Sequence, residues 1–69
     1  MMWVSELLQS LVIDDDDAIV TILIGGTPVA SGNWYQDQIL DYSEHNVRSF
    51  AVDYEKNRVI IRVDGELEL

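Results

Sequence analysis

The side chains best able to do chemistry are acidic and aromatic, and they fall in two stretches of the chain. The first is a run of four consecutive aspartates, and the second surrounds the only adjacent Trp-Tyr pair. Carboxylates pair with Lys and Arg, while the face of an aromatic ring also attracts a cation. We therefore expect both stretches to contact a basic protein surface. The candidate contact residues are Asp14, Asp15, Asp16, Asp17, Trp34, Tyr35, Asp37, Asp41, Tyr42 and Glu44.

Each stretch also has a purely structural interpretation. Acidic side chains keep small proteins dispersed whether or not they bind a partner. Trp34 could pack over the end of a small core that needs every large side chain. We favour packing for Trp34 and partner contact for Tyr35.

The acidic charge is concentrated in the first two thirds of the chain. The 69 residues carry 13 acidic and 4 basic side chains, a formal charge of -9, and Arg48 is the first basic residue. Such a chain should be repelled by the phosphates of DNA and RNA, so direct nucleic-acid binding is not expected. At 48% hydrophobic residues the chain is also too apolar for a disordered acidic tail.

Neither metal nor catalytic chemistry is indicated. Four consecutive aspartates lack the alternating oxygens, the glycine and the distal Glu of a calcium loop, so no metal and no cofactor are expected. His45 is the only histidine and stands beside Ser43 and Glu44. Residues so close in sequence do not ordinarily converge as nucleophile, base and orienting acid. We expect His45 to lie in a surface loop, and the protein not to be an enzyme.

Length and composition predict a single small domain, residues 1–69. No cysteine is present, so packing or a partner must provide stability instead of disulfides or thiolate zinc sites. The N-terminus lacks the basic start of a signal peptide, and the apolar run 18–24 is too short to cross a bilayer. We expect a cytoplasmic protein with no membrane contact.

The apolar spacing predicts a helix over residues 3–11, with Val4, Leu7, Leu8 and Leu11 on one stripe. Ser5 beside Glu6 is its expected N-terminal cap.

Strands are predicted over 18–24, 29–31, 47–54 and 58–63, and a short helix fits 36–42. The β-branched strand 18–24 should be central, and Pro28 places strand 29–31 at an edge. Gly25-Gly26 has the chemistry of a tight hairpin turn.

These elements predict an α+β fold: a three- or four-stranded antiparallel sheet built from two hairpins, with the first helix on one face. One short helix cannot cover both faces. We expect Phe50, Val52, Tyr54 and Ile60 to stay partly exposed on the other face, which invites a homodimer or another partner.

The order of elements resembles a pattern found among small uncharacterised proteins of phages and prophages. The matching segments span most of the chain: Val4 to Leu8, Asp14 to Asp17, Ile39 to Tyr42, Val47 to Phe50 and Val59 to Val63. The resemblance implies a phage or mobile-element accessory protein and assigns no activity or site residues. In size and charge the chain is also similar to small phage inhibitors of host defence nucleases and to DNA-mimicking blockers.

Together these observations favour a non-enzymatic interaction protein that blocks a basic surface of a partner, such as a nucleic-acid-handling or defence protein. The alternative is a structural, self-associating protein that pairs through its exposed sheet face and uses its charge only for solubility.

Overall fold

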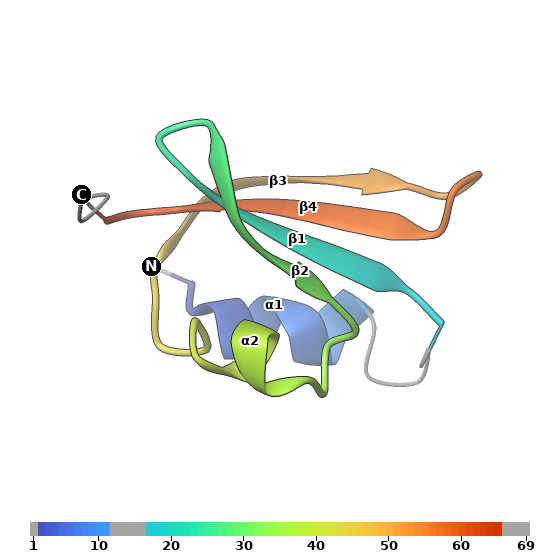
Figure 1. The fold of residues 1–69 in the computed structure, drawn as a ribbon, viewed down its shortest axis with the longest axis horizontal. Helices are drawn as coiled ribbons and strands as arrows, with labels where there is room; N and C mark the ends of the chain where they lie inside the picture. Colours follow the sequence, from blue (N-terminus) through green and yellow to red (C-terminus); the bar gives the residue numbers. More distant parts are fainter. Residues whose placement is uncertain (1, 12–16, 66–69) are drawn as a thin grey trace.

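A computed structural model describes residues 2–11 and 17–65; Asp14, Asp15 and Asp16 lie outside the described residues. The chain forms a short helix layer beneath a four-stranded sheet (Figure 1). This confirms the predicted α+β class, including the second short helix. The elements are α1 (Val4–Leu11), β1 (Ile19–Ile24), β2 (Thr27–Gly32), α2 (Asp37–Leu40), β3 (Val47–Asp53) and β4 (Arg58–Val63).

The sheet is mixed, with strand order β2-β1-β4-β3. Each hairpin is antiparallel, but the two hairpins meet through a parallel pair in which Ile19 lies opposite Arg58 and Ile24 opposite Val63. The sheet therefore differs at its centre from the antiparallel arrangement that the hairpin pattern predicts. Parallel pairing needs a long connection, and β2, α2 and β3 supply it here.

Strand β1 is central, as its β-branched sequence predicts. One of its faces is fully buried through Val20, Ile22 and Ile24, while the other face is half-buried. The turn after it is made by Gly25 and Gly26, whose φ angles of 58° and 83° suit the primed turns that match strand twist.

Strand β2 forms one edge of the sheet. Its register against β1 shifts by one residue, because Ile22 pairs with Ala30 and Leu23 with Pro28, which leaves Val29 as the extra residue of a bulge. A proline is tolerated at such an edge because it has no N–H to give to a ladder.

The buried side of β4 completes the core. Val59, Ile61 and Val63 are buried and alternate with exposed Arg58, Ile60 and Arg62, the alternation that the sequence predicts. The core consists of Val4, Leu7, Leu8, Ala18, Val20, Ile22, Ile24, Ile39, Val59, Ile61 and Val63.

The exposure expected for the β3 hairpin is observed, but its side chains divide between the two faces. Phe50 is 47% exposed, Tyr54 86% and Ile60 39%, while Val52 is half-buried. Phe50 lies opposite Ile61, a core residue, whereas Ile60 lies opposite Ala51. Directly paired residues share a face, so Phe50 belongs to the helix side and Ile60 to the open side. The prediction that all four side chains lie on one face of the sheet was therefore wrong.

Helix α1 begins one residue later than its apolar stripe predicts, at Val4. The carboxylate of Glu6 accepts a hydrogen bond from the Trp3 backbone N–H at 3.2 Å, which is one half of a capping box. Ser5 lies inside the helix instead of capping it, and its N–H donates to the Ser43 carbonyl at 3.0 Å. The start of α1 is thus tied to the loop that follows α2.

No helix in ranges 2–11 and 17–65 has the length and apolar character needed to span a membrane.

Candidate functional site

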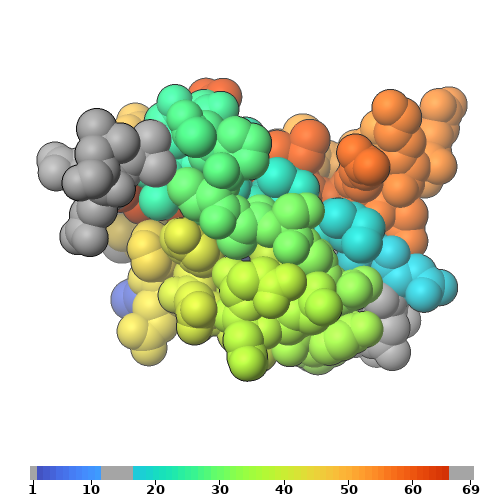
Figure 2. Space-filling view, in the orientation of Figure 1, coloured from blue at the N-terminus to red at the C-terminus, as the bar shows by residue number. Residues whose placement is uncertain are grey.

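The segment between Asn33 and Asn46 carries most of the predicted contact residues. It is a single helical turn flanked by tight turns, and it covers α1 from the front in Figure 2, where it is yellow-green to yellow. The backbone of the following loop is fixed by successive short bonds: the Tyr42 N–H donates to the Ile39 carbonyl, and the His45 N–H donates to the Tyr42 carbonyl, both at 3.0 Å.

A glutamine clamp holds the start of this segment against β2. The Asn33 N–H donates to Gln36 Oε1 at 2.7 Å, and Gln38 Nε2 donates to the Ser31 carbonyl at 3.3 Å. Gln38 Nε2 also bonds Gln36 Oε1 at 3.2 Å, which joins the two side chains. The clamp fixes the approach of the chain to α2, and so it positions the two aromatic residues between Asn33 and Gln36.

Trp34 and Tyr35 differ in their surroundings. Trp34 is half-buried and packs against the core, while Tyr35 is 49% exposed. Their rings meet edge to face with centroids 5.7 Å apart. The Trp34 indole Nε1 is buried and has no hydrogen-bond partner in the described chain. Trp34 therefore contributes to packing, and Tyr35 presents its ring to solvent.

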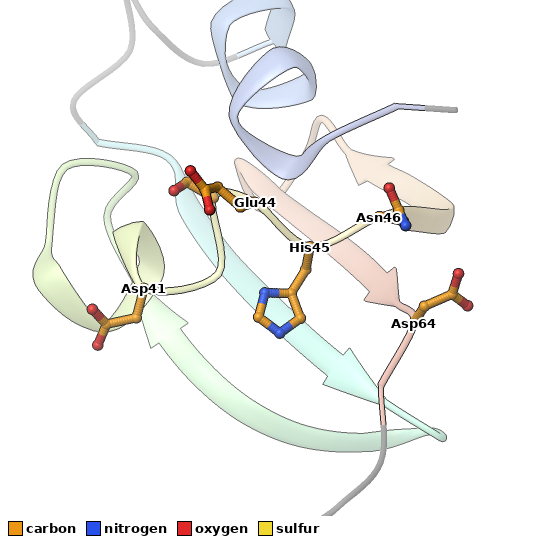
Figure 3. A pocket seen from close by; sticks show the side chains of 6 residues that line it. Asp41, Glu44, His45, Asn46 and Asp64 are labelled. Atoms are coloured by element: carbon orange, nitrogen blue, oxygen red, sulfur yellow. The ribbon is translucent and has the colours of Figure 1, made fainter.

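An open acidic hollow of about 450 Å³ lies at the end of the loop. It is lined by Asp41, Ser43, Glu44, His45, Asn46 and Asp64. Figure 3 shows its carboxylates around the rim, pointing in different directions instead of toward one point. Consistent with this spread, no cluster of three or more His, Cys, Asp or Glu suited to a metal is found among the described side chains. Its negative charge is therefore distributed over a wide mouth instead of being concentrated at one point.

The hollow joins residues that are distant in sequence. The Asp64 N–H donates to the Asn46 carbonyl at 3.0 Å, which brings the end of β4 to the loop. Its carboxylate also pairs with Arg48 Nη1 at 3.2 Å, in an ion pair exposed to solvent on both sides. His45 is half-buried, and its ring lies 4.9 Å from that of Tyr42 between centroids.

A small apolar groove adjoins the hollow. It has a volume of about 110 Å³ and lies between α1 and the segment after β2. Ser43 lines both depressions, so the acidic hollow and the groove are neighbours. The groove is lined by Ser5, Leu8, Gln9, Trp34, Leu40 and Ser43.

The predicted contact residues do not form one surface. The hollow is lined by Asp41 and Glu44, and the groove is lined by Trp34. Tyr42 packs against the core. Asp37 lies exposed in the first turn of α2. Asp17 precedes β1, whereas Asp64 follows β4. The parallel pairing of β1 with β4 puts Asp17 and Asp64 at opposite ends of strands about 20 Å long.

Sequence reasoning missed Asp64, His45 and Asn46 as parts of the site. Asp64 belongs to a hairpin whose charges nearly balance, and its approach to Asn46 follows from the antiparallel pairing of β3 with β4, in which Val47 lies opposite Val63. For His45, the only indication in the sequence was its position directly after the predicted contact residue Glu44.

Comparison with known proteins adds no relative: no protein-family model matches the chain, and no curated protein and no solved structure matches it either.

Proposed function

We propose that this chain is a non-enzymatic interaction protein that binds a basic surface of a partner protein and blocks it. The observation that carries the proposal is the acidic hollow beside an apolar groove, joined at Ser43. Such a pair of depressions suits a segment in which an apolar side chain neighbours Lys or Arg, because each side chain finds a complementary environment.

Three features support a basic partner. Asp41, Glu44 and Asp64 surround the hollow, and at its rim Arg48 forms an ion pair with Asp64. The exposed ring of Tyr35 on the same segment provides a surface on which a guanidinium can stack. The long-range field of -9 charges accelerates the encounter with a positive surface.

The partner's chemistry follows from this arrangement. A surface rich in Arg and Lys with interspersed apolar side chains is typical of proteins that handle nucleic acid, which use it to bind phosphates. Occupation of that surface by this chain excludes nucleic acid sterically and electrostatically. The pattern-level resemblance to phage and prophage accessory proteins agrees with a role against a host protein of this kind.

The experiment uses two short peptides titrated into ¹⁵N-labelled protein. The first peptide is Arg-Arg-Leu-Arg-Arg and the second replaces its leucine with glycine. We expect amide shifts at residues 41–46 and 64 with both peptides. Shifts of the groove residues on α1 and of the Trp34 indole N–H are expected with the leucine peptide alone. Shifts spread evenly over all acidic residues, or identical for both peptides, would contradict the proposal.

Charge variants then locate the contact. Asp41→Asn and Glu44→Gln should each weaken binding of the leucine peptide roughly twofold to fivefold, as expected for partly exposed ion pairs. Asp17→Asn is the matched control, because it removes the same charge at the other end of the sheet. Equal weakening by Asp17→Asn would show that only total charge matters.

A further inference from the structure

The two edges of the sheet differ in how well they are protected. Along β2, Pro28 removes an N–H, the bulge at Val29 breaks the register, and α2 packs alongside. Strand β3 pairs with β4 on one side only. At its start, the Val47 N–H donates to the Met2 carbonyl at 2.8 Å. From residue 49 to 53 its other side has no partner strand within the described chain.

Apolar side chains accompany this open edge. Phe50 is nearly half exposed, Val52 is half-buried, and Tyr54 is almost fully exposed just beyond the strand. An edge that is apolar and free of proline or a covering helix readily accepts another strand, because its N–H and C=O groups are already extended.

Charge favours a second copy of this chain. The hairpin over residues 47–65 holds all four basic side chains and three acidic ones, so it is nearly neutral in an otherwise acidic protein. Two copies can approach here without the repulsion that two acidic faces would experience. Strand β3 also has Arg48 near its start and Asp53 at its end. An antiparallel copy therefore places the basic end of one strand beside the acidic end of the other, which avoids contact between like charges at either end.

We propose that β3 pairs with β3 of a second copy, antiparallel and centred on Ala51, to join the two sheets into one. In this register Phe50 lies opposite Val52 of the second copy on the helix side, and Ser49 lies opposite Asp53 of the second copy on the open side. The interface is isologous, since the same residues serve on both copies, and it closes as a dimer. The acidic hollow stays outside it, so the dimer is independent of the proposed function.

Light scattering after gel filtration over a concentration series tests the dimer. The mass should rise toward twice the 7.9 kDa of one chain as concentration increases. Phe50→Lys should raise the dissociation constant roughly tenfold or more, because it places a charge at the centre of the paired edge. Ile60→Lys is the matched control, since Ile60 is similarly exposed but belongs to the open face. Circular dichroism establishes that each variant remains folded.

A charge placed at Ser49 provides the second readout. In the proposed register Ser49 lies opposite Asp53 of the second copy, so Ser49→Lys should tighten the dimer and Ser49→Asp should weaken it. Three results overturn the proposal: a monomer throughout the series, a dimer lost with Ile60→Lys but kept with Phe50→Lys, or equally tight dimers of Ser49→Lys and Ser49→Asp.

Discussion

Asp41 and Asp64 line the same hollow although one ends α2 and the other follows β4. Among the described residues, an ion pair is found at Asp64, whose partner Arg48 lies 3.2 Å away and partly neutralises the rim on that side. The two carboxylates therefore differ in what they offer to a basic ligand. Asp64 shares its charge with Arg48, whereas Asp41 makes no ion pair with another described residue.

Replacement of Arg48 by Gln should strengthen binding of the Arg-Arg-Leu-Arg-Arg peptide. Loss of the guanidinium returns the Asp64 charge to the hollow, and we expect affinity to rise roughly twofold to fivefold in dilute protein. Stability should fall by less than about 1 kcal/mol, because the ion pair is exposed. Isothermal titration and urea unfolding measure the two effects. Weaker peptide binding in Arg48→Gln would mean that the peptide does not use this rim.

The elements were largely predictable from local patterns. The β-branched run of β1, the Gly25-Gly26 turn and the alternation in β4 each depend on residues adjacent in sequence, and each appears in the structure. Short-range chemistry specifies such features because the side-chain periods and the turn angles are local.

The long-range arrangement was not predictable in the same way. The parallel β1–β4 pair and the bulge at Arg48 depend on how the two hairpins dock, and no local pattern reports that docking. The parallel pair places Asp17 far from the hollow, at the opposite end of the strands from Asp64. The bulge lets Val47 lie opposite the core residue Val63 while Ser49 lies opposite the exposed Arg62. The candidate site was therefore predicted at Asp41 and Glu44 and missed at His45, Asn46 and Asp64.

Gly32 and Gln36 should be energetically coupled. A Cβ at residue 32 would collide with the amide oxygen of Gln36 and come within 2.6 Å of the Gln38 amide nitrogen. Gly32→Ala should therefore displace the glutamine clamp and cost roughly 1 to 2 kcal/mol, the value of the bonds lost. Gln36→Ala should cost a similar amount because it leaves the Asn33 N–H without its acceptor.

The double variant gives the decisive measurement. If both substitutions act through one clamp, their combined cost should be clearly less than the sum of the single costs in urea unfolding. Strict additivity would mean that the clamp does not mediate the effect of Gly32→Ala.

Substitution of Trp34 should mainly lower the free energy of unfolding, whereas substitution of Tyr35 should mainly weaken peptide binding. Trp34→Ala should cost roughly 3 kcal/mol because it removes a ring packed on the core. Trp34→Phe should cost much less, since the buried Nε1 makes no hydrogen bond that could be lost. Tyr35→Ala should leave stability nearly unchanged and weaken binding of the basic peptide. A large stability loss in Tyr35→Ala would assign that ring to packing as well.

Substitutions of Asn57 should show how much the turn that joins β3 to β4 contributes to stability. Its φ of 53° is the left-handed conformation, in which a Cβ is unfavourable but Asn and Gly are tolerated. Its carbonyl also accepts the Ile19 N–H at 3.0 Å, so the turn anchors the start of β1. Asn57→Val should therefore cost about 1 to 2 kcal/mol more than Asn57→Gly, because both variants remove the amide side chain and only valine conflicts with the backbone angle. Urea unfolding of both variants separates the two outcomes, and equal destabilisation would assign the effect to the lost side chain instead of the backbone angle.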